Sequence, residues 1–158
     1  MQMRGKLYII SCYLSAVFCC CAFACYVSDD TNFPAAAERA RATNRPLLLA
    51  FLGTDWSISS LKLDREVFDQ AEFADDSKYN FLLCKIHFYQ TQERAAAVLV
   101  QNQQLAEKFR VDQFPTVIVL SPNGVELGRL GYIAGGVQKF AAAVNEIIFR
   151  GRDNAKAN

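Results

Sequence analysis

The sequence predicts a single α/β domain in which helices flank a mixed sheet of about four strands, with a hairpin near its C-terminal end. Helical patterns alternate with short apolar runs along the chain, and two of these runs are continuous, as in strands buried on both faces. The turn sequence Ser-Pro-Asn-Gly at 121–124 separates the last two strand patterns. A chain of 158 residues with 52% hydrophobic residues can bury one core of ordinary size.

The domain is expected to begin with a capped helix and a buried strand. Asn32 can accept hydrogen bonds from the free N–H groups of a helix that starts after it, and the helix-forming residues that follow end at Asn44. Residues 46–52 are an apolar run that begins at a proline and stops before Gly53, which is typical of a strand buried on both faces.

Helical and strand patterns continue to the end of the domain. Apolar residues seven positions apart predict an amphipathic helix at 57–68, which starts at serines. The other expected elements are a short helix at 70–78, a strand at 80–89, a helix at 94–109, a strand at 116–120, its hairpin partner at 125–133 and a last helix at 137–149. We expect Gly151 to end the last helix, and residues 151–158 to be a disordered tail.

The N-terminal residues have the pattern of an export signal. Arg4 and Lys6 form a short positive region, and residues 7–24 are an uncharged apolar run that ends in the small-x-small cleavage pattern Ala-Phe-Ala. A run of about 18 residues can also span a membrane, so an uncleaved anchor is the alternative. Cys25 follows a sequence that resembles a bacterial lipoprotein box, which makes its lipidation a third reading.

These patterns predict the organisation and the location of the chain. The expected parts are a signal peptide or membrane anchor at 1–24, a linker at 25–31, the domain at 32–150 and the tail at 151–158. We expect an exported, periplasmic protein that stays attached to the membrane if the N-terminal segment is retained.

Charge and cysteine content narrow the classes of function. Without Arg4 and Lys6 the 17 basic residues fall to 15, against 16 acidic residues, so nothing in the charge suggests a nucleic-acid partner. Five of the six cysteines lie within the first 25 residues, and Cys84 is the one well inside the domain. The exported part has no cysteine pair with the spacing of a zinc site or a redox dithiol, and we predict no metal and no cofactor.

Four stretches of the domain resemble the thioredoxin-like superfamily, in order and in spacing. They are 47–56, Leu-Leu-Leu-Ala-Phe-Leu-Gly-Thr-Asp-Trp; 61–73, Leu-Lys-Leu-Asp-Arg-Glu-Val-Phe-Asp-Gln-Ala-Glu-Phe; 105–120, which contains Phe-Pro-Thr; and 121–132, the hairpin. Together they look most like secreted single-domain disulfide reductases of the DsbH and DsbD C-terminal type. The resemblance implies a thioredoxin-like fold over nearly all of the exported part.

The resemblance also assigns positions in the candidate site. Trp56 lies where the family has the Trp before its first cysteine, Ser57 at the nucleophilic cysteine and Ser60 at the resolving cysteine. Ile58 and Ser59 occupy the variable pair between them.

A second segment of the family site is implied later in the chain. Phe114, Pro115 and Thr116 match the loop that carries a cis proline, which faces the active site and offers backbone groups to an extended substrate. A cis X–Pro bond occurs in about one in twenty X–Pro pairs of folded proteins. With Trp56, Ile58 and Ser59, these residues form the expected substrate groove.

The two serines remove the chemistry that this site usually performs. Thiol–disulfide exchange needs a thiolate with a pKa near the ambient pH, which attacks a disulfide sulfur. A serine hydroxyl is far too weak an acid for that step, so we expect neither Ser57 nor Ser60 to be catalytically active. The serines are better explained as residues that cap and start the helix.

Other side chains give weaker signals for chemistry. A serine hydrolase would need a base beside its nucleophile, and the single histidine, His87, lies in a predicted strand with no sign of an acid partner. Cys84 is expected to be a small buried residue. The acidic residues from Asp64 to Asp76 are expected to form a solvated helix face.

Two functional hypotheses remain. The first is a redox-inactive thioredoxin-like module of the cell envelope that binds extended or unfolded exported polypeptides, as a chaperone or assembly partner. The second is a thiol–disulfide oxidoreductase whose two active-site cysteines are replaced here by Ser57 and Ser60. For the chain as written we favour the first.

Overall fold

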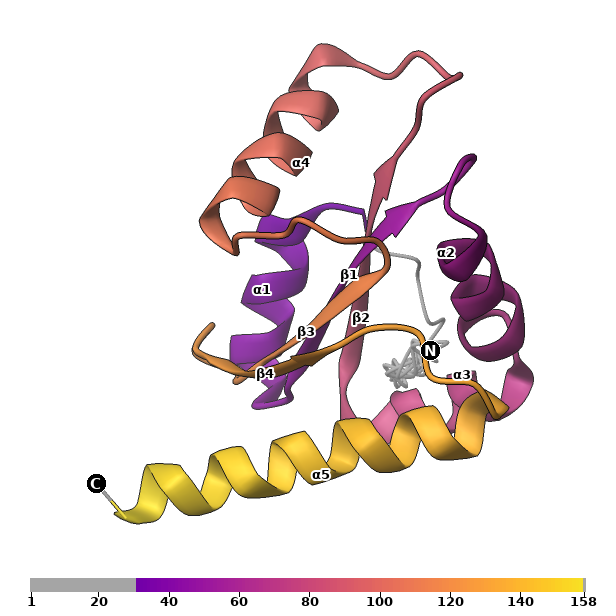
Figure 1. Cartoon of the computed structure of the whole chain (residues 1–158). Helices are drawn as coiled ribbons and strands as arrows, with labels where there is room; N and C mark the ends of the chain where they lie inside the picture. Colours follow the sequence, from indigo (N-terminus) through magenta and orange to yellow (C-terminus); the bar gives the residue numbers. More distant parts are fainter. Residues whose placement is uncertain (1–30, 158) are drawn as a thin grey trace, which may run out of the picture.

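The computed structural model describes residues 31–157, which form a four-stranded mixed sheet with helices on both faces (Figure 1). The strand order is β2-β1-β3-β4, with β2 parallel to β1 and the other neighbours antiparallel. The strands are β1 (Leu47–Gly53), β2 (Leu82–Phe88), β3 (Thr116–Leu120) and β4 (Glu126–Leu130). The predicted fold class is confirmed.

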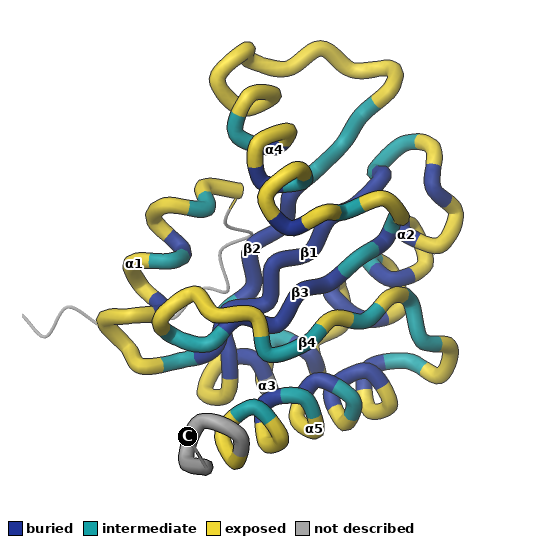
Figure 2. Tube along the Cα trace, turned by 60° about the vertical axis from the view of Figure 1, so that its left-hand side comes forward, coloured by how far each residue is buried: buried dark blue, intermediate teal, exposed yellow. Residues whose placement is uncertain are grey.

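The helices divide between the two faces of the sheet. They are α1 (Phe33–Thr43), α2 (Ile58–Leu63), the π-helix η1 (Asp64–Phe68), α3 (Ala71–Asn80), α4 (Ala96–Lys108) and α5 (Gly136–Ala157). Alternate residues of β1 face opposite ways: Leu48 packs in the cluster formed with α2, η1, α3 and α5, whereas Leu49 packs in the cluster formed with α1 and α4. Figure 2 shows the central strands buried and the outer helix surfaces exposed.

Strand β1 is buried on both faces because helices pack on each face of the sheet where it lies. All seven of its residues are buried, and its parallel pairing with β2 is made through the crossover that contains α2, η1 and α3. The continuous apolar run of residues 46–52 is the sequence signature of this position.

The ends of α1 follow the predicted signals. Asn32 Oδ1 accepts a hydrogen bond from the Ala35 amide at 3.1 Å, and Asn44 adopts the left-handed conformation that closes the helix, with φ of 51°. The next residue, Arg45, donates through its guanidinium to the carbonyl oxygens of Ser77 and Phe81, at the end of α3. This contact joins the start of β1 to the end of the crossover.

The expected end of the last helix was wrong, whereas the helix expected at 57–68 is present with a change of geometry. Helix α5 does not end at Gly151 but runs to Ala157, so the backbone of the expected disordered tail at 151–158 is helical as far as it is described. Gly151 serves a packing role, since a Cβ atom there would lie 2.8 Å from the Leu127 side chain. The helix expected at 57–68 changes from α to π geometry at Asp64.

The N-terminal predictions lie outside the described residues. They comprise the signal or anchor at 1–24, lipidation of Cys25, and the linker apart from Thr31. Within residues 31–157, no helix combines the length and apolar character needed to cross a bilayer.

Candidate functional site

The site lies where β1 ends and α2 begins. Gly53 closes the strand, and three residues later Trp56 turns its ring back over it, so that a Cβ atom on Gly53 would lie 2.7 Å from the indole. The indole Nε1 donates to the Phe88 carbonyl oxygen at 3.2 Å. Trp56 is nevertheless 40% exposed, so one surface of the ring faces solvent.

Both serine hydroxyls are engaged within the protein. Ser57 is the N-cap of α2: its Oγ accepts from the Ser60 amide at 3.3 Å and donates to the Phe114 carbonyl oxygen at 3.1 Å. Ser60 Oγ accepts from the Gly53 amide at 3.0 Å. Both side chains are buried. The hydroxyls therefore act as capping and bridging groups, as expected of serines at a helix start.

The loop before β3 forms the other wall of the site. The Phe114–Pro115 peptide bond is cis. The Phe114 ring lies edge-on to the Trp56 ring at 5.3 Å between centroids and contacts the Phe88 ring at 5.0 Å. Thr116 begins β3, and its hydroxyl donates back to the Gln113 carbonyl oxygen at 2.8 Å. The structure thus brings the Trp56 turn and the Pro115 loop together.

The remaining predicted groove residues are exposed on α2. Ile58 is 72% exposed, and Ser59 is also exposed on the first turn of α2. Leu61, which the sequence analysis did not single out, adds a further exposed apolar side chain to this helix.

Asp55 organises the neighbouring loop, a role that sequence reasoning missed. Its carboxylate accepts from the hydroxyl and amide of Thr91 and from the amide of Gln90. The pKa of Asp55 is lowered, chiefly by the Thr91 hydroxyl and then by the Gln90 amide, because these donors favour the charged carboxylate. A carboxylate in a short turn gives no sequence signal for partners more than 30 residues away.

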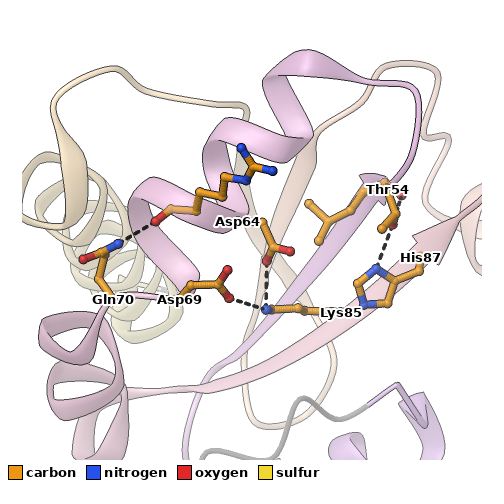
Figure 3. A network of polar contacts seen from close by, with 8 residues as sticks. Thr54, Asp64, Asp69, Gln70, Lys85 and His87 are labelled. Carbon is orange, nitrogen blue, oxygen red and sulfur yellow. Dashed lines mark hydrogen bonds and ion pairs between the residues drawn. The ribbon is translucent and has the colours of Figure 1, made fainter.

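A buried ion pair lies beneath α2 and η1 (Figure 3). Lys85 Nζ in β2 is 2.8 Å from Asp64 Oδ1 and 3.7 Å from Asp69 Oδ1, and only 3% of the Lys85 side chain is exposed. The expectation that Asp64 lies on a solvated face was therefore wrong, because its carboxylate pairs with the buried Lys85 ammonium group. The sequence signal was a lysine in the middle of an apolar strand.

The secondary candidates also have definite places. His87 Nδ1 lies 2.8 Å from the Thr54 hydroxyl. Cys84 has no exposed surface, as expected of a small core residue. In the described part of the chain, no group of three or more His, Cys, Asp or Glu side chains could hold a metal ion.

Residues 33–148 match the family described as thioredoxin-like domain. The chain belongs to the thioredoxin-like domain family. Among curated proteins, it is similar to the disulfide bond reductase DsbH of Chlamydia pneumoniae, with 22% identity over 117 residues, 74% of this chain and 70% of that protein. It is also similar to the thioredoxin-related protein DsbJ of Chlamydia pneumoniae, with 26% identity over 100 residues, 63% of this chain but only 29% of that longer protein.

Solved structures with the thioredoxin-like fold superpose on this chain. A DsbH oxidoreductase matches with a TM-score of 0.71 and 22% identity, covering 75% of this chain and 82% of that one. A thioredoxin from Thermus thermophilus gives a TM-score of 0.57 at 19% identity, and the match covers 75% of this chain and 85% of that one. The DsbD C-terminal domain of Neisseria meningitidis in its oxidised form gives a TM-score of 0.53 at 20% identity. This match covers 72% of this chain and 90% of that one. The family resemblance drawn from the sequence is confirmed, whereas the placing of Ser57 and Ser60 at the two cysteine positions stays a prediction.

Proposed function

We propose that this chain is an exported thioredoxin-like module that binds extended or unfolded polypeptides beside Trp56 and Pro115 without exchanging disulfides. The observation that carries the proposal is that the Ser57 hydroxyl is used within the protein, where it caps α2 and donates to the Phe114 carbonyl oxygen. The same site has exposed apolar side chains.

The groups at the described site support the proposed absence of disulfide exchange. Of the residues the structure describes, Cys84 is the one cysteine, and it is fully buried in the core. Ser57 and Ser60 offer hydroxyls that cannot form thiolates, and their oxygens are already in hydrogen bonds. The relative DsbH is named a disulfide bond reductase; the chemistry in that name needs thiols at a site of this kind.

Polypeptide binding is favoured by what remains exposed. Trp56, whose ring contacts that of Phe114, is partly exposed, and Ile58 and Leu61 follow it in the chain as exposed aliphatic residues of α2. Exposed apolar groups that gather at one place on a soluble domain mark interaction surfaces. Their fitting partner is an extended segment with apolar or aromatic side chains, as an unfolded exported protein would offer. Export itself is supported by the N-terminal sequence pattern.

Trp56 fluorescence provides the binding test. We expect titration of the full chain with a reduced, carboxymethylated unfolded protein to change Trp56 emission saturably. Ile58→Asp should weaken binding at least tenfold, whereas Val125→Asp, which adds the same charge at an exposed apolar position between β3 and β4, should change affinity less than threefold. No response to unfolded protein would refute the binding proposal.

Insulin reduction tests the redox part separately. The chain as written should not turn over insulin disulfides above the rate of the reductant alone, whereas the double variant Ser57→Cys, Ser60→Cys should do so. Turnover by the chain as written would overturn the redox-inactive proposal and favour the oxidoreductase hypothesis.

A further inference from the structure

The helix that follows Trp56 carries two exposed cations beyond its exposed apolar residues. Ile58 and Leu61 are 72% and 36% exposed, and Lys62 and Arg65 are also exposed. Positions three, four and seven apart share one side of a helix, so these four side chains form one strip along α2 and the start of η1, called here the α2 strip. The buried residues of the same stretch are Ser60, Leu63, Val67 and Phe68.

The carboxylates of this stretch are turned to other partners. Those of Asp64 and Asp69 face the buried Lys85 ammonium group, as Figure 3 shows. Glu66 Oε2 accepts a hydrogen bond from the Tyr132 hydroxyl at 2.5 Å. Among the residues that the structure describes, no ion pair joins either cation of the α2 strip to a carboxylate. The strip therefore offers two positive charges to a partner in solution.

The spacing of the α2 strip defines what an extended segment must offer to it. A helix rises about 1.5 Å per residue, so residues four to seven positions apart on the strip are separated by about 6 to 10 Å along the axis. An extended chain advances about 3.3 Å per residue, so this separation corresponds to two or three residues. The complementary segment has carboxylates two or three positions away from an apolar or aromatic residue.

We propose that the polypeptide segments bound beside Trp56 are those in which acidic residues lie two or three positions from an apolar residue. The apolar side chain packs against Ile58 and Leu61, and the carboxylates pair with Lys62 and Arg65. This inference rests on the proposed polypeptide-binding function, and it narrows the substrate class from unfolded chains in general to segments with this charge pattern. Segments with basic residues at those positions are disfavoured, because like charges then meet at the strip.

Three peptides of matched shape test this preference. Each has Phe-Leu at its centre and one Gly on both sides, followed outward at each end by two Glu, two Gln or two Lys residues, so that both chain directions are offered. In an NMR titration of the full chain, followed at the amides of α2, we expect the Glu peptide to bind about fivefold more tightly than the Gln peptide at low ionic strength. The Lys peptide should bind more weakly than the Gln peptide. Salt at about 0.5 M should reduce both differences.

Charge reversal assigns the preference to named side chains. The double variant Lys62→Glu, Arg65→Glu should bind the Lys peptide more tightly than the Glu peptide and should keep its affinity for the Gln peptide. The control is Arg41→Glu, Lys108→Glu, which makes the same change in net charge at exposed positions of α1 and α4, on the other face of the sheet. It should keep the original order of the three peptides.

The outcomes separate this inference from the proposed function. Equal binding of the three peptides, or an order that Lys62→Glu, Arg65→Glu does not change, would overturn the inference and leave polypeptide binding intact. Undiminished binding of a Glu peptide with Gly-Gly in place of Phe-Leu would also overturn it, because the α2 strip would then hold any polyanion. Self-association of the chain that Ile58→Asp abolishes would assign the strip to a second copy and overturn it. No binding of any peptide or of unfolded protein would overturn both proposals.

Discussion

The Ser57 hydroxyl donates a hydrogen bond of 3.1 Å to the carbonyl oxygen of Phe114, which lies 57 positions later in the chain. The Ser57 Oγ also accepts a hydrogen bond from the Ser60 amide, so this one side chain both caps α2 and ties it to the Pro115 loop. A thiolate could accept the cap hydrogen bond but has no proton to donate to a carbonyl. At this position serine therefore holds the two walls of the site together in a way that a reactive cysteine would not.

Removing the Ser57 hydroxyl should destabilise the fold. We expect Ser57→Ala to lower the free energy of unfolding by about 1 kcal/mol, because it removes the helix cap and the bond to the loop. Urea denaturation followed by circular dichroism measures this. Ser59→Ala, at an exposed position in the same turn, is the control and should change stability by less than about 0.5 kcal/mol. Equal effects of the two variants would contradict the bridging role of Ser57.

Gly53→Ala should disturb the site while leaving the sheet pairing in place. The added methyl would lie 2.7 Å from the Trp56 ring and 2.8 Å from Ser57 Cβ, so the indole must move. We expect a shifted Trp56 emission maximum and weaker binding of unfolded protein. Gly124→Ala, at a turn glycine with φ of 82° and open space around it, is the comparison: it should affect stability but not Trp56 emission. An unchanged Trp56 environment in Gly53→Ala would contradict the packing described.

The buried pair of Lys85 and Asp64 should behave differently from an exposed ion pair. Lys85→Met leaves the Asp64 carboxylate without its closest cation, and we expect a loss of about 3 kcal/mol in unfolding free energy. The double variant Lys85→Met, Asp64→Leu should be more stable than Lys85→Met alone, because no unpaired charge remains. Arg150→Ala, which breaks the exposed Glu146–Arg150 pair, should cost less than about 1 kcal/mol. A double variant as unstable as the sum of its single changes would contradict this account.

The loop held by Asp55 should respond to acid. The folded pKa of Asp55 lies below its ordinary value of 3.8, so the stabilisation is complete at neutral pH and is lost as the pH falls through the lowered pKa. We expect the amide NMR signals of Gln90 and Thr91 to move below about pH 4. In Asp55→Asn this transition should be missing. Signals that titrate in the same way in both proteins would assign the transition to another group.

Much of the fold was predictable because its signals are local. The strand at 116–120 was placed at its observed bounds, and the Asn32 cap was read from a single residue, because apolar runs and capping side chains act within one element. Trp56 and Pro115 could be expected to meet only through the family resemblance. No local pattern joins positions so far apart.

The features that sequence reasoning missed depend on tertiary contacts. The partners of Asp55 and Lys85 come from other elements, and the Asp64 carboxylate is held by a lysine of β2 rather than by solvent. Gly151 resembles a helix terminator in sequence, but its missing side chain is used to accommodate Leu127. In each case, the packing of a neighbouring element decides between two locally acceptable structures.

The Arg45 contact has a consequence for how the domain assembles. By joining the start of β1 to the end of α3, the guanidinium closes a loop of 36 residues that contains Trp56, Ser57 and α2 but not the Pro115 segment. The first wall of the groove therefore lies inside the loop that Arg45 closes, and the second wall is joined to it through the pairing of β3 with β1. Because the Trp56 ring contacts the Phe114 ring, Trp56 fluorescence should report during refolding when these two walls pack together.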